Sequence, residues 1–299
     1  MDRKLIKVYI FLLVAFIAVF PLVRYKDILI TDIADSFTQL INHKIQDITM
    51  GMTHCPPSDN QRTKKPLSPN KAKIIFVLDD NWESQYTFAF QVLKRRNFPA
   101  TIAVIPSKVN QPDYMSLSQL QDVYRNGWDL VNHTFDHKNL STLDREEQSD
   151  QIMRGTAWLN SKCFTQASNI VVYPYGAFNS STIQVLAEKK YRGARSLIEG
   201  FEKNQPYTTY QAKVQNLTTP VTTEQVKDWI DEAIQNKKTL IFVNHRFADQ
   251  TVDPTSMIYD KTRFVEVVNY LAEVQDKVQV ITYSEWLDNE QQIRPSHPN

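Results

Sequence analysis

Reactive side chains occur at four places in the sequence, each just after a short apolar run that predicts a buried strand. Two adjacent aspartates, Asp79 and Asp80, follow the first of these runs. The later groups are, in chain order, the pair His133 and His137, the turn Pro174–Gly176 with Tyr175 at its centre, and His245. The carboxyl ends of parallel strands meet on one rim of a βα-barrel, so we expect the four groups to converge there.

These residue types in this arrangement point to a metal centre with a proton-transfer group beside it. Two histidines four residues apart can bind one metal ion, and a strand-end carboxylate completes a two-histidine, one-carboxylate set with open coordination positions. Alone, an aspartate after a strand is often just the N-cap of the next helix. Adjacent carboxylates at Asp79 and Asp80 repel each other unless a cation lies near them, which favours the functional interpretation.

The elements that must position these groups alternate between strand and helix from Lys71 onward. Apolar runs predict strands over residues 73–78, 100–105, 128–131, 170–173, 191–196, 210–214, 239–243 and 278–281. Helical patterns lie between them over residues 83–96, 117–125, 143–159, 181–190, 223–235 and 262–274, and Thr142 is the expected cap of the third. This alternation predicts an α/β fold with a mostly parallel sheet. Seven or eight such units in about 220 residues favour a closed barrel over an open sheet.

The first 26 residues have the pattern of an export signal or a membrane anchor. Arg3, Lys4 and Lys7 precede an uncharged, mostly apolar run over residues 8–23. No small-residue cleavage site follows the run, so we expect an uncleaved single-pass anchor rather than a cleaved signal. Basic residues stay on the cytoplasmic side of a membrane, so we expect the rest of the chain to be extracytoplasmic. A buried core helix is the less favoured alternative.

Composition divides the remainder of the chain into further parts. Residues 27–52 have helical apolar spacing and predict an amphipathic stalk helix, whereas residues 53–71 are rich in proline and predict a linker. The barrel is expected over residues 72–290, followed by a short C-terminal tail. The only two cysteines, Cys55 and Cys163, leave a disulfide open but exclude a cysteine-based zinc cage.

Charge and glycine content exclude other function classes. The chain has 34 Lys+Arg and 33 Asp+Glu, so no basic excess favours nucleic-acid binding. Its six glycines form no G-x-G-x-x-G or G-x-x-x-x-G-K pattern, which excludes a Rossmann dinucleotide site and a P-loop.

Four segments resemble the successive motifs of the polysaccharide deacetylase domain, also called the NodB-homology or carbohydrate esterase family 4 domain. They are residues 77–82 (VLDDNW), 132–137 (NHTFDH), 173–176 (YPYG) and 243–245 (VNH). The resemblance spans about Lys73 to Leu287, with order and spacing preserved. It implies an incomplete (β/α)7 barrel. It also implies a metal-dependent N-deacetylase acting on N-acetylglucosamine units of an exopolysaccharide or of peptidoglycan.

The resemblance further implies a role for each matching residue. The ligands of one divalent metal, usually Zn²⁺ with Co²⁺ or Ni²⁺ as alternatives, would be Asp80, His133 and His137. Asp79 would be the general base and His245 the general acid. A backbone N–H near Tyr175 would hold the oxyanion. The products would be acetate and a free amine on the glycan.

One departure from the family pattern affects the general base. Val172 stands where the family has an arginine that braces the base, and we expect Arg195, at the end of the next strand, to replace it. The YPYG form without the arginine also resembles a branch of the family that acts on secreted poly-N-acetylglucosamine. Two alternatives stay open. One is a homologue that binds glycan without cleaving it, and the other is a metal-dependent amidase or esterase acting on a non-carbohydrate acyl substrate.

Overall fold

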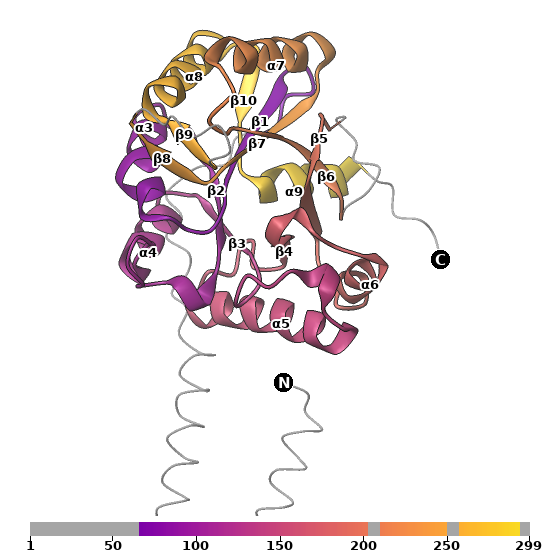
Figure 1. The fold of residues 1–299 in the computed structure, drawn as a ribbon. Coiled ribbons are helices and arrows are strands. Elements are labelled where there is room, and N and C mark those ends of the chain that lie inside the picture. The colour runs from indigo at the N-terminus through magenta and orange to yellow at the C-terminus, as the bar shows by residue number, and fades with distance from the viewer. Residues whose placement is uncertain (1–65, 203–209, 250–256, 294–299) are drawn as a thin grey trace, which may run out of the picture. The chain divides into compact units, whose positions relative to one another are not determined.

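The structure is a computed structural model that describes residues 66–202, 210–249 and 257–293. Its strands are β1 (Ala72–Leu78), β2 (Thr101–Val104), β3 (Asp129–Asn132), β4 (Ile170–Val172), β5 (Gly193–Glu199), β6 (Ala212–Asn216), β7 (Thr239–Asn244), β8 (Arg246–Ala248), β9 (Ile258–Asp260) and β10 (Val278–Val280). Its α-helices are α3 (Gln91–Lys94), α4 (Leu117–Arg125), α5 (Arg145–Ser161), α6 (Ser180–Glu188), α7 (Thr223–Asn236), α8 (Lys261–Glu273) and α9 (Tyr283–Ile293). Strands and helices alternate in the predicted order (Figure 1).

Several of the sequence predictions concern residues outside the described ones. They are the membrane anchor (1–26), the stalk helix (27–52), Cys55 and the linker up to residue 65. Among the helices that the structure describes, none combines the length and the apolar character needed to span a bilayer.

The main sheet forms a closed parallel barrel (Figure 1). Its strand order is β10-β1-β2-β3-β4-β5-β6-β7, and β1 also pairs with β7, which closes the ring. On its other edge, β1 pairs with β10 over Ala72–Ile74 and with β2 over Val77–Leu78. Strand β10 therefore occupies only the start of that edge. The predicted seven-stranded α/β barrel, formed by β1 to β7, is confirmed.

Side chains alternate across the barrel wall, as the period of a strand requires. In β1, Ile75 and Val77 pack into the apolar cluster inside the barrel. Ile74, Phe76 and Leu78 instead pack with the apolar residues of the outer helices. Every residue of β1 is buried, as expected for a parallel strand that is covered on both faces.

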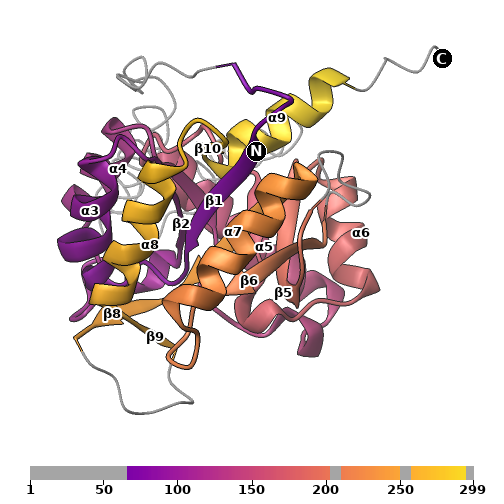
Figure 2. The ribbon, with the colours of Figure 1, turned by 90° about the horizontal axis from the view of Figure 1, so that it is seen from above.

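Helix α9 closes the end of the barrel at which the strands begin, and Figure 2 shows it beside the start of β1. Its residues Tyr283, Trp286 and Leu287 belong to the apolar cluster inside the barrel. The Ser284 N–H donates a 2.7 Å hydrogen bond to the carboxylate of Asp129, the first residue of β3. The opposite end of the barrel is left to the loops that follow the strands.

The predicted helix over residues 83–96 begins at residue 83 as expected, but it is irregular. A π-helix covers Gln85–Phe90 and passes directly into α3. Residues 83 and 84 are α-helical and lead into the π-helix, whereas Trp82 lies outside the helix and forms a bridge with Tyr114.

Helix α5 begins later than predicted, and Thr142 is not its cap. Thr142 ends a short 3-10 turn, and Asp144 caps the helix. The Asp144 carboxylate accepts from the Glu147 N–H at 2.9 Å, and the Glu147 carboxylate accepts from the Asp144 N–H at 3.2 Å. This reciprocal capping box satisfies two amide groups at once, which explains why the helix begins there.

Among the strands and α-helices that the structure describes, β8, β9 and α9 were not predicted from the sequence. Strands β8 and β9 pair with each other and have three residues each, too few to show a period. Helix α9 extends past residue 290, where the barrel was expected to end.

Candidate active site

The reactive groups predicted from the sequence meet at the barrel end opposite α9. The inner face of three strands ends in a valine of the internal apolar cluster, namely Val77, Val131 and Val243. Because successive residues point to opposite sides of a strand, the residues two positions later also point inward. These residues are Asp79, His133 and His245, and each is buried or half-buried.

Asp80 and the two nearby histidines form a compact cluster of metal-ligand types. Asp80 Oδ1 lies 3.2 Å from His133 Nε2 and 3.3 Å from His137 Nε2. One ligand atom from each of the three residues lies within 4.8 Å of the other two. The second carboxylate oxygen, Oδ2, accepts a hydrogen bond from the Trp82 indole N–H at 3.0 Å. The indole therefore orients the carboxylate with Oδ1 toward both imidazoles.

The hydrogen bonds of this cluster fit a cation. His133 Nδ1 lies 2.8 Å from the Val172 carbonyl oxygen, so Nδ1 carries the proton of the neutral ring and Nε2 presents a lone pair. Asp80 Oδ1 is buried and accepts no hydrogen bond from the described residues. A metal ion would give these facing lone pairs a common partner. The donor set therefore fits a divalent metal with open coordination positions.

Burial and neighbouring charges set the protonation of the cluster. Burial, followed by the charge of His133, lowers the pKa of His137 from 6.5 to about 4. Burial alone would raise the pKa of Asp80, but its histidine neighbours, His133 above all, hold that pKa below its ordinary value. At neutral pH the cluster therefore contains a neutral His137 and an ionised Asp80, the states that metal binding requires.

A tight bend, not a helix, brings His133 and His137 together. The Asn132 side-chain oxygen accepts from the Thr134 N–H at 2.8 Å, and Thr134 Oγ1 accepts from the His137 N–H at 3.1 Å. Thr134 and His137 have positive φ angles of 61° and 59°. The sequence left a helical face and a tight turn open, and these side-chain-to-backbone bonds explain the turn.

Asp79 lies buried between Arg195 and His245. A guanidinium nitrogen of Arg195, which has no exposed surface, donates to Asp79 Oδ1. The other carboxylate oxygen, Oδ2, lies 3.7 Å from His245 Nε2. Burial lowers the pKa of His245. The expected contact between Arg195 and Asp79 is therefore present, and the catalytic role of each of these residues stays a prediction.

Tyr175 lies at the edge of the site with 65% of its surface exposed. Its backbone has φ 58° and ψ 12°, a left-handed conformation within the Pro174–Gly176 turn. The centroid of its ring lies 4.7 Å from that of His137. A hollow of about 650 Å³ is lined by His137, Lys138, Asn139, Thr142, Leu143 and Tyr175. The site therefore opens to solvent beside Tyr175.

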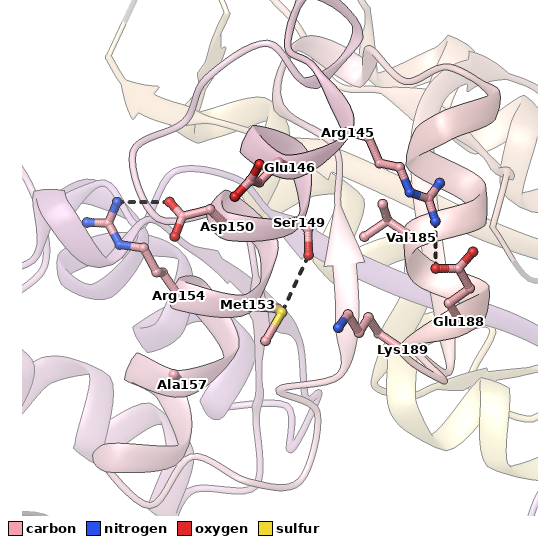
Figure 3. Close-up of a pocket in the computed structure, with 10 residues that line it drawn as sticks. All are labelled: Arg145, Glu146, Ser149, Asp150, Met153, Arg154, Ala157, Val185, Glu188 and Lys189. Carbon is pink, nitrogen blue, oxygen red and sulfur yellow. Dashed lines mark hydrogen bonds and ion pairs between the residues drawn. The ribbon is translucent and has the colours of Figure 1, made fainter. Parts of the chain in front are cut away.

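A second hollow, of about 720 Å³, lies between α5 and α6 on the outside of the barrel (Figure 3). Four of its charged side chains are paired: Arg145 with Glu188 at 2.5 Å, and Arg154 with Asp150 at 3.3 Å. No histidine or cysteine lines it. The groups that fit the predicted chemistry lie instead at the end of the barrel.

Sequence reasoning missed two residues that orient the metal-ligand cluster. The Trp82 indole holds Asp80, and the Val172 carbonyl holds His133. For Trp82, the sequence did offer a signal: an indole N–H donor two residues after Asp80, within the same motif, could have been predicted to bind its carboxylate. Val172 acts through its backbone, so no side-chain pattern could report its contact.

Comparison with known proteins shows a similarity to one family over the first part of the barrel. Residues 67–194 match the family model described as polysaccharide deacetylase. YxkH of Bacillus subtilis (strain 168), a polysaccharide deacetylase by name, is 26% identical over 124 residues, which cover 42% of this chain and 44% of the relative. The poly-beta-1,6-N-acetyl-D-glucosamine N-deacetylase of Staphylococcus aureus (strain MRSA252) is 26% identical over 143 residues, which cover 43% of this chain and 49% of the relative. The match thus spans about half the length of these relatives or less.

Solved structures share the barrel fold at low sequence identity. A Mycobacterium smegmatis structure is 15% identical with a TM-score of 0.55, and the match covers 79% of this chain and 97% of that chain. The Xyl-CE4 domain of a multidomain xylanase from the hindgut metagenome of Trinervitermes trinervoides is 16% identical with a TM-score of 0.52. This match covers 76% of this chain and 95% of that chain. These likenesses show the fold alone. The family match and the curated relatives together show that residues 67–194 are similar to polysaccharide deacetylases.

Proposed function

We propose that this barrel is a metal-dependent N-deacetylase acting on N-acetylglucosamine units of an extracytoplasmic polysaccharide. The observation that carries the proposal is that a set of metal-ligand residues and a set of proton-transfer residues lie together at one end of the barrel. Asp80 and its two histidines fit a metal ion, and the buried pair of Asp79 and Arg195 lies next to His245. The similarity of residues 67–194 to polysaccharide deacetylases supports the same class of reaction.

Asp80, His133 and His137 would hold the metal, which we expect to be Zn²⁺, with Co²⁺ or Ni²⁺ as alternatives. A divalent ion held there would polarise the acetamide carbonyl and make a water molecule more acidic. Tyr175 would present the glycan at the open edge of the site, and its backbone N–H is our candidate donor to the oxyanion.

Asp79 and His245 would move the protons. Arg195 binds Asp79 Oδ1, so Oδ2 remains available to accept the proton of the attacking water. Burial lowers the pKa of His245, which makes its protonated form a stronger acid toward the leaving nitrogen. Water and the acetamide are consumed, and acetate and a free amine on the glycan are formed.

We propose poly-N-acetylglucosamine as the first substrate to test, with peptidoglycan and chitin oligomers as comparators. The staphylococcal relative is named for the β-1,6-linked polymer. We also propose that the barrel lies outside the cytoplasm. Residues 1–26 would anchor it to the membrane, or it would be secreted if that segment is cleaved.

Acetate release from the three glycans tests the proposed function. We expect release that stops on chelation and returns with Zn²⁺. His133→Ala should lose both metal and activity, whereas Asp79→Asn should abolish turnover and keep the metal, because Asp79 is not among the proposed ligands. Full metal content and activity in His133→Ala would overturn the metal assignment. If Asp79→Asn loses the metal and Asp80→Asn keeps it, the two aspartates have exchanged roles.

A valine at position 172, where the family has an arginine, would by itself favour a homologue that binds glycan without cleaving it. Arg195 brings a cation to Asp79 from another strand, so the valine does not favour an inactive site. Acetate release from non-carbohydrate amides, without release from any glycan, would instead favour the amidase alternative.

A further inference from the structure

The buried side chain of Gln85 joins the two loops that carry Asp79 and His245. Its nitrogen Nε2 donates to the Asp79 carbonyl oxygen and, at 2.9 Å, to the His245 carbonyl oxygen. Both acceptors are oxygens, so the amide must direct its nitrogen toward them, because a flipped amide would place oxygen against oxygen. The side chain has no exposed surface. Gln85 therefore crosslinks two main-chain segments from a position with no solvent exposure.

Further hydrogen bonds hold the main chain on both sides of His245. The Phe247 N–H donates to the Ser84 hydroxyl at 3.1 Å. The Asp79 N–H donates to the Asn244 carbonyl at 2.8 Å. The loop after β1 thus contacts the residue before His245, His245 itself and the second residue after it.

The position of the His245 ring depends on this backbone anchoring. Its Nδ1 is buried and has no hydrogen-bond partner among the described residues. Its Nε2 lies 3.7 Å from Asp79 Oδ2, which is longer than a hydrogen bond. Within the described part of the chain, the ring is therefore held by its main chain rather than by a hydrogen bond of its own.

The backbone around Gln85 is itself unusual. Gln85 begins the π-helix Gln85–Phe90, and single π-helical turns occur frequently at functional sites. The Gln85 N–H donates to the Trp82 carbonyl at 3.0 Å. Trp82 in turn orients Asp80. One short segment therefore contacts the metal-ligand cluster and both proton-transfer residues.

We propose that Gln85 is a positioning residue that sets the distance between the base Asp79 and the acid His245. The proposal rests on the proposed deacetylase function. Gln85 acts through the main chain of the two residues and touches neither side chain. Precise placement matters because a displacement of about 1 Å can reduce a rate by about 100-fold.

Gln85→Met tests the proposal, because it removes both donors and nearly conserves side-chain volume. We expect kcat to fall by roughly 10- to 100-fold, with KM changed by less than about threefold and metal content unchanged. The pH profile of kcat should also change, because the distance between the base and the acid would change. Gln91→Met is the matched control, because Gln91 follows the same π-helix and, among the described residues, its side chain donates to the Tyr86 carbonyl and to neither loop. It should leave kcat and the pH profile unchanged.

Gln85→Glu keeps the shape of the side chain and provides the test if Gln85→Met does not fold. Its protonated form restores one donor and its ionised form restores none, so activity relative to wild type should recover as the pH falls. An unchanged kcat and pH profile in folded Gln85→Met would overturn the proposal. Equal losses in Gln85→Met and Gln91→Met would overturn it too.

Failure of the proposed function would have a different signature. The wild-type protein would then release no acetate from any glycan. In that case, the imidazole NMR resonances of His245 would report whether Gln85 positions this residue. Those resonances should move in Gln85→Met and stay in place in Gln91→Met. Resonances that do not move in Gln85→Met would overturn the positioning role independently of activity.

Discussion

Asp79 and Arg195 show how a single buried contact links folding to the proposed chemistry. Arg195 has no exposed surface and Asp79 is 2% exposed, so water solvates neither charge. Removing one member of such a pair leaves the other charge buried and uncompensated, which typically costs about 3–5 kcal/mol. Stability and turnover must therefore be measured separately for any variant of this pair.

We expect Arg195→Met to lose both stability and turnover. The free energy of unfolding should fall by about 3–5 kcal/mol, because Asp79 would stay buried without its cation. Turnover should fall because, among the described residues, no other group donates a hydrogen bond to Asp79 Oδ1. Urea unfolding measures the first effect, and acetate release at a temperature where the variant is folded measures the second.

The double variant Asp79→Asn/Arg195→Met separates the two effects. It removes both charges, so much of the lost stability should return, since a neutral buried pair needs no counter-charge. Turnover should remain absent because the base is gone. A double variant as unstable as Arg195→Met would contradict the explanation from buried charge.

At the scale of elements, α5 positions the loop over residues 133–137. The Gln151 side-chain oxygen accepts from the Asp136 N–H at 3.0 Å, and its amide nitrogen donates to the Asp136 carboxylate at 3.1 Å. One turn further along the helix, Gly155 lies against the Asn132 side chain. This close approach is the reason that the helix carries a glycine at this position.

We expect Gly155→Ala to lower the free energy of unfolding by about 1–3 kcal/mol and to weaken metal binding. A Cβ on residue 155 would lie 2.2 Å from Asn132 Oδ1. Asn132 cannot simply move away, because its Nδ2 donates to the Ile152 carbonyl at 2.7 Å and its Oδ1 holds the Thr134 N–H. Displacing Asn132 would disturb the bend between the two histidines. Urea unfolding and metal titration measure the two effects.

Asn160→Ala is the matched control, because Asn160 is exposed on the same helix. It should change neither stability nor metal binding appreciably. Normal metal affinity in a destabilised Gly155→Ala variant would show that the histidine bend does not depend on this helix contact.

At the scale of the whole molecule, buried titratable groups make stability depend on pH. Burial lowers the pKa of His137 from 6.5 to about 4, and it also lowers the pKa of His245. Between pH 6.5 and 4 the unfolded chain therefore binds more protons at His137, and the free energy of unfolding rises with pH. Burial raises the pKa of Asp129 and of Glu202, whose effects have the opposite sign.

His137→Gln isolates the contribution of His137, because the other groups are present in both proteins. On going from pH 7.5 to pH 5, the metal-free wild type should lose about 2 kcal/mol more stability than His137→Gln. Urea unfolding at the two pH values measures the difference. Equal pH dependence in the two proteins would show that His137 titrates normally in the folded state.

Removal of residues 1–26 should release a soluble catalytic domain, whereas the full chain should fractionate with membranes. The expectation comes from the apolar run over residues 8–23 and its basic flanks. Cell fractionation combined with acetate release tests both the anchor and the activity of the released barrel. Protection of the barrel from protease in intact cells without an outer barrier would contradict the extracytoplasmic orientation.

Local sequence patterns determined the order of the elements and the strand ends that carry the reactive groups. Apolar runs and their two-residue period are local properties, so they place Asp79, His133 and His245 on the inner face once each strand is recognised. Residues Gln85–Phe90 lie within the predicted helix, but their π-helical geometry was not predicted, because their contacts involve residues far along the chain, such as Asp122 and His245.

Only the tertiary structure decided which partner each carboxylate meets. Simple alternation would send Asp79 and Asp80 to opposite sides of the strand, but a positive φ of 74° at Asp80 turns the chain as the strand ends. Asp80 then contacts the histidines after β3, and Asp79 contacts Arg195, 116 residues later. A local pattern sets the direction of a side chain along its own strand, whereas the distance between strands follows from closure of the barrel.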